Sequence, residues 1–532
     1  MATITIMKLP PDYLIITAIM MIALVLPLNL IAHQPFHHDE ALYATWALRI
    51  ISGQDVWLAD TAVDKPPLFL YTLALTFKLL GTTEITARLP SLVASMLTVM
   101  LTYQLGRAWY NRATGMLAAW LVTLSPFTVM LGSTALTDPM LVMFVLASCL
   151  MVTKQHPLAA GVCMGLALAT KQQGLFFLPL IVACYGLTIP SSQYKRPYRF
   201  WKPIRSKLTN HASRFTLSFM AIILLIFTWD IHRAPMPSFL TYSATNYGGL
   251  HFDINGAAER GRGFIELLQY STALPNFNLI SLLGIMLFLV ISTLRNSSTG
   301  LSLCHVSKPQ LYMDWLLFLF CALFLLGHAL VSFQVWDRYL LGLIPLLALL
   351  MARLWLMPYL WLKNNGVRTF RFAPSKPKGL HSNYRLHLFY YVILITWLSY
   401  LLWLPVQDAV QGRYPLGSHS QALQGIEQIV AYLQGHVGAQ NTLYHHWLGT
   451  YWRFYLWNYP YDLQYWDTPQ MLANKAKPGH FIAFPTWVSD TEARLALAQK
   501  GLYLHEVTRA YNERGGPSII LYRLEMRTGL AK

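Results

Sequence analysis

Four ionisable residues in a row, His37, His38, Asp39 and Glu40, follow the first apolar segment of this chain. Carboxylates at the edge of a membrane are costly to keep near hydrocarbon, so ionisable groups found there commonly serve function. The Asp39 carboxylate has the chemistry of a general base, which accepts a hydroxyl or amine proton as that group attacks a sugar carbon. Glu40 is a candidate for binding the attacking group. Both acids also suit the first turn of a helix, where they favour the helix dipole, and that alternative stays open.

Lys65 is the second candidate for chemistry. It stands in the run Asp64-Lys65-Pro66-Pro67, and a proline biases the residue before it toward an extended backbone. An ammonium group held in a fixed direction can neutralise a phosphate leaving group as a point charge. A lysine that snorkels to the membrane interface would look the same in the sequence.

Asp138 is the third candidate. The run Thr137-Asp138-Pro139 separates two apolar segments, and Pro139 suits the first position of a helix that Asp138 caps. Capping alone is a sufficient explanation. If Asp138 lies on the same face of the membrane as Asp39, the two carboxylates are candidate catalytic groups. They are also candidate ligands of a divalent metal ion, which is the candidate cofactor.

The composition is that of a membrane protein with many spans. Of the 532 residues, 55% are hydrophobic and only 12% are charged, whereas soluble domains carry roughly a quarter charged residues. Apolar segments of roughly 20 residues cross a bilayer, and we expect about eleven of them. They lie near residues 12–32, 87–106, 113–131, 139–153, 157–170, 174–190, 215–232, 275–294, 312–333, 339–358 and 387–405.

The basic residues predict the orientation of these spans. The formal net charge is +17, and Lys and Arg gather in residues 191–214 and 363–385 and at Arg107 and Arg112. Under the positive-inside rule these loops are cytoplasmic, which puts the N-terminus inside and the C-terminus outside the cell (inner) membrane. A nucleic-acid-binding patch would not explain this alternation, so no nucleic acid partner is expected. Residues 13–32 lack a signal-peptide cleavage site and are expected to stay as a helix.

Two regions are expected outside the bilayer. The outer-face loop, residues 33–86, has helical spacing over 39–51 and 68–80, both too short to span and suited to the membrane surface. Farther on, strands are predicted at 441–446, 463–466 and 480–485, helices at 421–433 and 491–500, and a final hairpin around Arg514. We therefore expect a transmembrane domain, residues 1–410, and a C-terminal extracytoplasmic α/β domain, residues 411–532.

Four short motifs occur in order near the start of the chain. They are His38-Asp39-Glu40-Ala41-Leu42-Tyr43, Asp64-Lys65-Pro66-Pro67-Leu68, Ala87-Arg88-Leu89-Pro90-Ser91 and Leu136-Thr137-Asp138-Pro139. Together they resemble the integral-membrane GT-C glycosyltransferases, nearest to the protein O-mannosyltransferases and the lipid A aminoarabinose transferase. The resemblance implies an α-helical polytopic membrane protein of GT-C type with amphipathic surface helices. It also implies a polyprenyl-phosphate sugar donor, a lipid, glycan or protein acceptor, and a reaction on the outer face among membrane lipids.

The same resemblance implies roles for individual residues. Asp39 matches the first-loop aspartate that acts as base, and Asp138 matches a second-loop acid. Lys65 matches the lysine that holds the donor phosphate, Asp64 the acid before it, and Tyr43 an aromatic residue that lines the same cavity.

One position departs from the family pattern. The aminoarabinose transferase has an arginine just before the tyrosine, where this chain has Leu42, so a phosphate contact is lost. Arg338, in a predicted outer-face segment, is the candidate replacement in donor binding, although pairing with Asp337 explains it equally well. A lid role for the glycine-rich segment 233–274 is a weaker possibility.

The predicted function is a glycosyltransferase with Asp39 as base and Lys65 on the donor phosphate. A transporter or flippase of lipid-linked sugars is the alternative, although such proteins carry ionisable residues near the bilayer midplane in repeated halves. A catalytically inactive protein that binds a lipid-linked sugar is the third possibility.

Overall fold

The computed structural model describes residues 11–188, 201–246, 249–297, 307–358, 380–417, 423–436, 441–512 and 515–526. The chain forms two compact units. The membrane unit consists of Met1–Leu30, Trp57–Phe69 and Leu89–Leu416, and the sheet unit of Ile31–Val56, Leu70–Arg88 and Gly417–Lys532. The predicted domain boundary near residue 411 stays a prediction.

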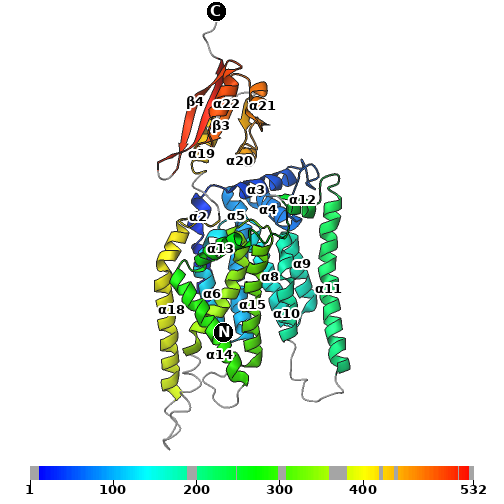
Figure 1. Ribbon diagram of the computed structural model, residues 1–532, viewed down its shortest axis with the longest axis vertical. Coiled ribbons are helices and arrows are strands. Elements are labelled where there is room, and N and C mark those ends of the chain that lie inside the picture. The colour runs from blue at the N-terminus through cyan, green and yellow to red at the C-terminus, as the bar shows by residue number, and fades with distance from the viewer. Residues whose placement is uncertain are drawn as a thin grey trace, which may run out of the picture. The chain divides into compact units, whose positions relative to one another are not determined.

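Helices make up nearly all of the described membrane unit, and α11, α15 and α18 run as long, similarly directed ribbons in Figure 1. The helices that lie within it are α1 (Pro11–Val25), α6 (Arg112–Leu124), α7 (Pro126–Gly132), α8 (Asp138–Thr153), α9 (Pro157–Thr170), η1 (Gln172–Phe177), α10 (Leu178–Thr188), α11 (Trp201–Ile231), α12 (Phe239–Thr245), α13 (Ala257–Leu268), η4 (Gln269–Ser271), α14 (Pro275–Ser297), α15 (Lys308–Leu330), η5 (Asp337–Leu343), α16 (Ile344–Trp355) and α18 (Leu380–Val410). Three more contribute residues to both units: α2 (Leu28–His33), α4 (Pro67–Leu80) and α5 (Glu84–Trp109).

Among the described residues, seven helices are long and apolar enough to cross a membrane, so the chain is a multi-pass membrane protein. The predicted span at 113–131 is a bent pair, α6 and α7, whose axes differ by 58°. Pro126 explains the break, because its ring removes a backbone donor and clashes with the preceding turn. The predicted spans at 139–153, 157–170 and 174–190 are shorter apolar helices of 16, 14 and 17 residues. All eleven predicted segments are therefore helical, and seven or eight are of full spanning length.

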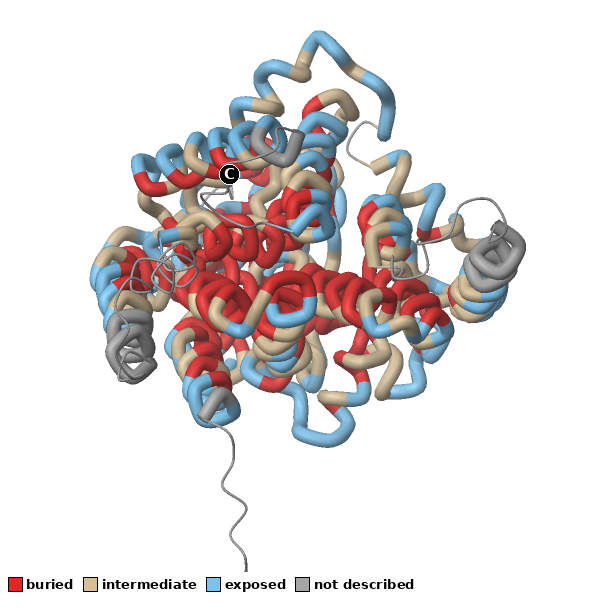
Figure 2. Tube along the Cα trace, turned by 90° about the horizontal axis from the view of Figure 1, so that it is seen from below, coloured by how far each residue is buried: buried red, intermediate tan, exposed pale blue. Residues whose placement is uncertain are grey.

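Burial separates the inner helices of the membrane unit from the outer ones. In Figure 2 buried segments run through the middle of the bundle and exposed segments lie at its rim. In the apolar window of the span Asp337–Trp355, 78% of the residues are buried, whereas only 17% are buried in that of Asn210–Ile231. Exposed leucines and isoleucines on a spanning helix are stable in contact with lipid, so the poorly buried helices are read as lipid-facing.

The sheet unit is built on five strands. They are β1 (Thr442–His445), β2 (Asp462–Tyr465), β3 (Phe481–Pro485), β4 (Leu502–Tyr511) and β5 (Pro517–Met526), in the spatial order β2-β1-β3-β5-β4. Strand β1 pairs in parallel with β2 and β3, while β5 is antiparallel to β3 and β4. The helices are α3 (His38–Ile51), α19 (Ile426–Gly435), α20 (Gly449–Tyr455), α21 (Pro469–Lys475) and α22 (Thr491–Ala498).

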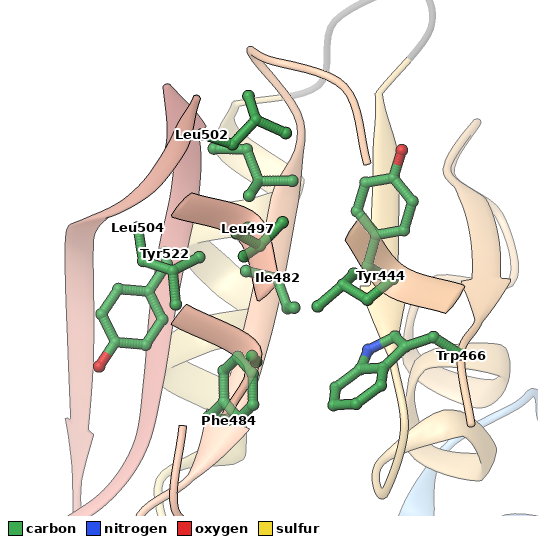
Figure 3. Close-up of a cluster of buried hydrophobic side chains, with 11 residues drawn as sticks. Tyr444, Trp466, Ile482, Phe484, Leu497, Leu502, Leu504 and Tyr522 are labelled. Carbon is green, nitrogen blue, oxygen red and sulfur yellow. The ribbon is translucent and has the colours of Figure 1, made fainter. Parts of the chain in front are cut away.

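A compact apolar core holds this sheet together. Figure 3 shows Tyr444, Ile482 and Tyr522, from three strands, in one cluster with Trp466 and Leu497. Every residue of β3, the central strand, is buried, as its continuous apolar sequence predicts. The small C-terminal α/β domain is thus confirmed, with strands within one residue of their predicted bounds. Helix α19 begins later than predicted, and Gln421 and Arg514 lie outside the described residues.

Candidate active site

The four-residue run at 37–40 forms the start of α3. His37 is the N-cap, and its Nδ1 accepts a hydrogen bond of 3.2 Å from the Asp39 backbone N–H. The Glu40 carboxylate accepts a 2.8 Å hydrogen bond from the His37 backbone N–H, which completes a capping box. Two acids in the first turn also favour the helix dipole. These residues therefore do start a helix, as the alternative interpretation of the run expects.

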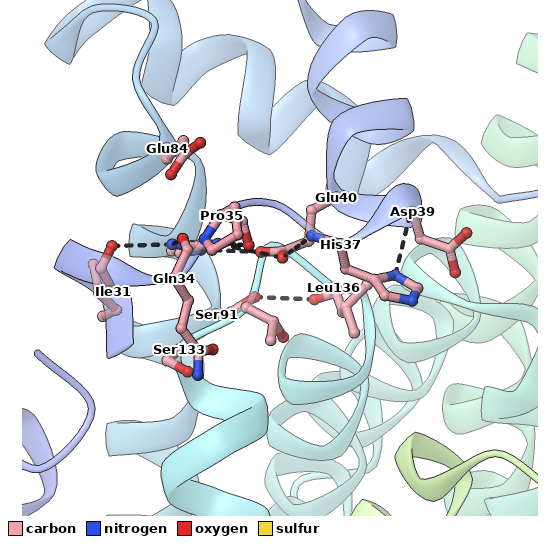
Figure 4. A network of polar contacts seen from close by, with 12 residues as sticks. Ile31, Gln34, Pro35, His37, Asp39, Glu40, Glu84, Ser91, Ser133 and Leu136 are labelled. Atoms are coloured by element: carbon pink, nitrogen blue, oxygen red, sulfur yellow. Dashed lines mark hydrogen bonds and ion pairs between the residues drawn. The ribbon is translucent and has the colours of Figure 1, made fainter. Parts of the chain in front are cut away.

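Glu40 has a buried partner. The Arg88 Nε donates to the Glu40 carboxylate at 3.0 Å, and both side chains are buried, at 0% and 1% exposed. The other Arg88 nitrogens donate to the backbone carbonyls of Ile31, Gln34 and Pro35 at 2.7 to 3.1 Å. Figure 4 shows these contacts converging on the segment before α3. This geometry favours a structural role for Glu40, and the predicted acceptor contact stays a prediction.

Asp39 has a different environment from its neighbour. Its side chain is 18% exposed and lies 3.9 Å from Nδ1 of His38, which is 52% exposed. In Figure 4 the Asp39 carboxylate points away from Glu40. A partly exposed carboxylate next to a histidine has the chemistry that a base needs.

Tyr43 lies one turn farther along α3. It is buried, and its ring centroid lies 5.6 Å from that of Trp46. Asp39, Glu40 and Tyr43 all belong to the sheet unit, whereas the other predicted site residues belong to the membrane unit.

The membrane unit contains a cavity of about 330 Å³ that gathers most of those other residues. Asp64, Lys65 and Arg338 all line it, and their shared role in donor binding stays a prediction. The Lys65 ammonium is paired with the Asp64 carboxylate, and Gln172 Nε2 donates to the Asp64 backbone carbonyl at 3.0 Å. This hydrogen bond ties the residue before Lys65 to the start of η1.

Arg338 reaches the same cavity from the start of η5. Its guanidinium lies 4.2 Å from the ring centroid of Trp336, a cation–π distance. The neighbouring Asp337 carboxylate accepts a 2.7 Å hydrogen bond from the Arg338 backbone N–H and does not line the cavity. Trp336 therefore orients the guanidinium.

Lys171 is a site residue that the sequence prediction missed. It lies between α9 and η1, lines the cavity, and donates a 2.7 Å hydrogen bond to the Asp138 carboxylate. Both side chains are buried. Burial lowers the pKa of Lys171 to about 8, Asp138 opposes that shift, and the nearby Arg338 and Lys65 charges add to it. The three cations are therefore close enough to affect one another.

This cavity brings three cationic side chains together. Lys65, Lys171 and Arg338 line it, and Lys65 and Lys171 pair with Asp64 and Asp138. A phosphate group has the charge and the acceptor atoms to bind clustered cations of this kind.

The structure offers less support for a metal ion. Across the described parts of the chain, no group of three or more His, Cys, Asp or Glu side chains is placed to hold one. Asp138 has Lys171 as its partner. In the glycine-rich segment 233–274, the Asp253 carboxylate accepts a 2.7 Å hydrogen bond from Arg260.

Comparison with known protein families gives one match, over part of the chain. Residues 64–229 match the family described as dolichyl-phosphate-mannose-protein mannosyltransferase. No curated protein matches the chain in sequence.

Solved structures match over nearly the whole chain. ArnT from Cupriavidus metallidurans bound to undecaprenyl phosphate has a TM-score of 0.61 at 14% identity, over 96% of this chain and 97% of that one. The apo form of ArnT gives the same TM-score and identity over 97% and 98%. The apo oligosaccharyltransferase of Archaeoglobus fulgidus has a TM-score of 0.50 at 10% identity, over 93% of this chain and 69% of that one. At these identities the likeness concerns the fold.

Proposed function

We propose that this multi-pass membrane protein, which is similar in fold to ArnT and whose residues 64–229 match a mannosyltransferase family, transfers one sugar from a polyprenyl-phosphate donor to an acceptor. The cationic cavity of the membrane unit is the observation that carries this proposal. Its cationic side chains, Lys65, Lys171 and Arg338, suit the negative charge of a sugar phosphodiester. ArnT, which is similar in fold, was crystallised with undecaprenyl phosphate, and this supports a lipid phosphate as the ligand.

Lys65, Lys171 and Arg338 are proposed to hold the donor phosphate. As the bond between the sugar carbon and the phosphate oxygen breaks, a second negative charge develops on the phosphate. Cations fixed in a partly enclosed cavity stabilise that charge more than they stabilise the donor itself, which is the condition for catalysis. Asp64 and Asp138 are proposed to orient two of these cations through their ion pairs.

Asp39 is proposed to act as the general base. It takes the proton of the acceptor hydroxyl or amine while the acceptor atom bonds to the sugar carbon, and the electron pair of the broken bond leaves with the polyprenyl phosphate. One displacement of this kind inverts the configuration of the sugar carbon. Glu40, by contrast, is proposed to fix the start of α3 through Arg88.

The reaction is proposed to take place on the extracytoplasmic face of the cell (inner) membrane, with the N-terminus in the cytoplasm. The basic segments at 191–214 and 363–385 support that orientation under the positive-inside rule, although they lie largely outside the described residues. The lipid, glycan or protein nature of the acceptor is left open. No metal ion has a step in this mechanism.

Purified protein in proteoliposomes tests the proposal. The probes are undecaprenyl-phosphate hexoses and pentoses labelled with tritium in the sugar, together with an envelope extract of lipids, glycans and proteins as the acceptor pool. A glycosyltransferase moves the label into the extract and leaves undecaprenyl phosphate behind. A flippase would move the intact donor across the bilayer, and an inactive binding protein would retain it, so either result would overturn the proposal.

A further inference from the structure

The sheet unit contains a second cavity, of about 370 Å³, that the proposed reaction does not use. We name it the Glu84 cavity after the first residue of α5. The side chains on which the argument rests are Thr82, Glu84, Gln434, Trp457, Tyr459 and Asn458. Its size lies within the range of small-molecule binding sites, roughly 300 to 1,000 Å³.

The floor of the Glu84 cavity is rigid. Phe454 lines it, and the Phe454 ring centroid lies 5.0 Å from Phe36 and 6.3 Å from Phe77. The neighbouring Tyr455 hydroxyl donates to the Glu84 carboxylate, and Gln434 Nε2 donates to the Tyr455 carbonyl at 3.3 Å. Helix α20 and the start of α5 are thereby linked through side chains, so the cavity is formed before any ligand arrives.

The segment that joins α4 to α5 is fixed as well. Gly81 ends α4 with a φ of +88°, a left-handed conformation that side chains rarely adopt. Thr83 and Thr86 exchange hydrogen bonds between hydroxyls and backbone N–H groups at 3.0 and 3.1 Å. These contacts hold Thr82 and Glu84 at the rim of the cavity.

The lining combines the groups that recognise sugar hydroxyls. Amides such as Asn458 and Gln434 both donate and accept hydrogen bonds, a carboxylate such as Glu84 accepts them, and a hydroxyl such as Thr82 does either. Trp457 and Tyr459 add aromatic rings, which suit the apolar face of a sugar. Figure 4 shows Glu84 apart from the dashed contacts around Glu40, so its carboxylate is not part of that network.

The lining is unsuited to an acidic ligand. No Lys or Arg is found among the described residues that line the Glu84 cavity, and the Glu84 carboxyl already accepts a hydrogen bond from Tyr455. A phosphate or another acidic group would therefore find no cationic partner in the lining, in contrast to the cavity that contains Lys171.

From these observations we infer that the Glu84 cavity binds a saccharide without acidic groups. The role of this saccharide binding rests on the proposed function, because the saccharide would be a sugar of the acceptor glycan. Binding itself needs no turnover and is tested separately.

The test uses the full chain in lipid nanodiscs, free of sugar-based detergent, on an array of neutral and acidic envelope-type oligosaccharides. We expect retention of neutral members, and a loss of affinity of roughly tenfold in Trp457→Ala, since central aromatic residues dominate such contacts. Trp487→Ala is the matched control, because Trp487 is an exposed tryptophan of the same unit, 53% exposed, that does not line the cavity. Asn458→Ala is a second cavity variant, chosen because Asn458 is exposed and its loss does not endanger folding.

Three results would overturn the inference: no binding of any neutral member, equal binding by the cavity variants and the wild type, or a preference for acidic members. Its failure is distinct from failure of the proposed function. A protein that transfers sugar from the lipid donor but has no saccharide affinity at this cavity disproves only the inference. A protein that binds neutral glycans here but never turns over the donor disproves only the proposed transfer.

Discussion

Arg88 in the sheet unit uses all five of its N–H donors, whereas Lys171 in the membrane unit donates to the Asp138 carboxylate and has two cationic neighbours. Both side chains are buried and both pair with an acid. The donors of Arg88 are all used within the protein, while Lys171 lines a cavity together with Lys65 and Arg338. A buried ion pair is therefore a stronger indication of a binding site when it borders a cavity lined by further cations.

The acids differ as well. Glu40 pairs with buried Arg88, whereas Asp39 beside it is partly exposed and lies near His38. In the cavity Asp64 and Asp138 pair with Lys65 and Lys171. The proposed base and the proposed phosphate-binding cations are the two chemical elements that a glycosyl transfer needs.

The largest expected effect is that of Asp39→Asn. Removal of a general base costs roughly 10²- to 10⁴-fold in rate, and the isosteric amide keeps the shape of the helix start. We expect kcat for sugar transfer to fall by that factor while donor affinity and thermal unfolding stay near the wild-type values. Tritium transfer in proteoliposomes measures the rate. A variant with full activity would remove Asp39 from the mechanism.

Arg88→Met tests how much the ion pair with Glu40 contributes to stability. Removal of one partner of a buried ion pair costs about 3 to 5 kcal/mol, because Glu40 would be left charged and unpaired. We expect a large drop in thermal stability. Arg413→Ala is the control, since Arg413 pairs with Asp408 at the surface and is 62% exposed, so its loss should cost no more than about 1 kcal/mol.

The double variant Glu40→Gln with Arg88→Met tests whether Glu40 has a structural role alone. It removes both charges, so part of the lost stability should return. Recovery of stability together with sugar transfer would confine Glu40 to a structural role. A stable double variant that lacks acceptor binding would instead support the contact first predicted for Glu40.

Local sequence patterns predicted most of the elements. The apolar segments became helices, and α3 and α4 begin one residue before their predicted starts. Short strands of the sheet unit were predicted within one residue, because alternation and turn residues are local signals. Helix α20 was missed, since its aromatic sequence has no clear period.

The missed site residues depended on distant contacts. Lys171 pairs with Asp138, 33 residues earlier, and Arg88 pairs with Glu40 across 48 residues. One signal was available for Lys171: Asp138 starts α8 and Lys171 follows the end of α9, so two short antiparallel helices of similar length bring them together. For Arg88 the sequence offered only its place in the motif Ala87-Arg88-Leu89-Pro90-Ser91.

Lys171→Met is expected to weaken use of the donor. A hydrogen bond between charged groups contributes about 1.5 to 3 kcal/mol, which corresponds to roughly a 10- to 150-fold loss in kcat/KM for the donor. Because the single variant leaves the Asp138 carboxylate buried without its partner, the double variant with Asp138→Asn separates that cost. Binding of undecaprenyl phosphate measured by calorimetry should fall in both variants. Unchanged binding in the double variant would remove Lys171 from the phosphate site.

The smallest expected effect is a pH dependence that only the membrane cavity has. Because the pKa of Lys171 is about 8, its ammonium is mostly charged at pH 7 and mostly neutral at pH 9. A sugar phosphodiester does not titrate in this interval, and kcat/KM reports the free enzyme, so we expect kcat/KM for the donor to fall about tenfold as pH rises across it. Arginine stays charged throughout this interval, so Lys171→Arg should flatten the decline. If wild type and Lys171→Arg decline together, the titrating group is another residue, and use of the donor does not depend on the charge of Lys171.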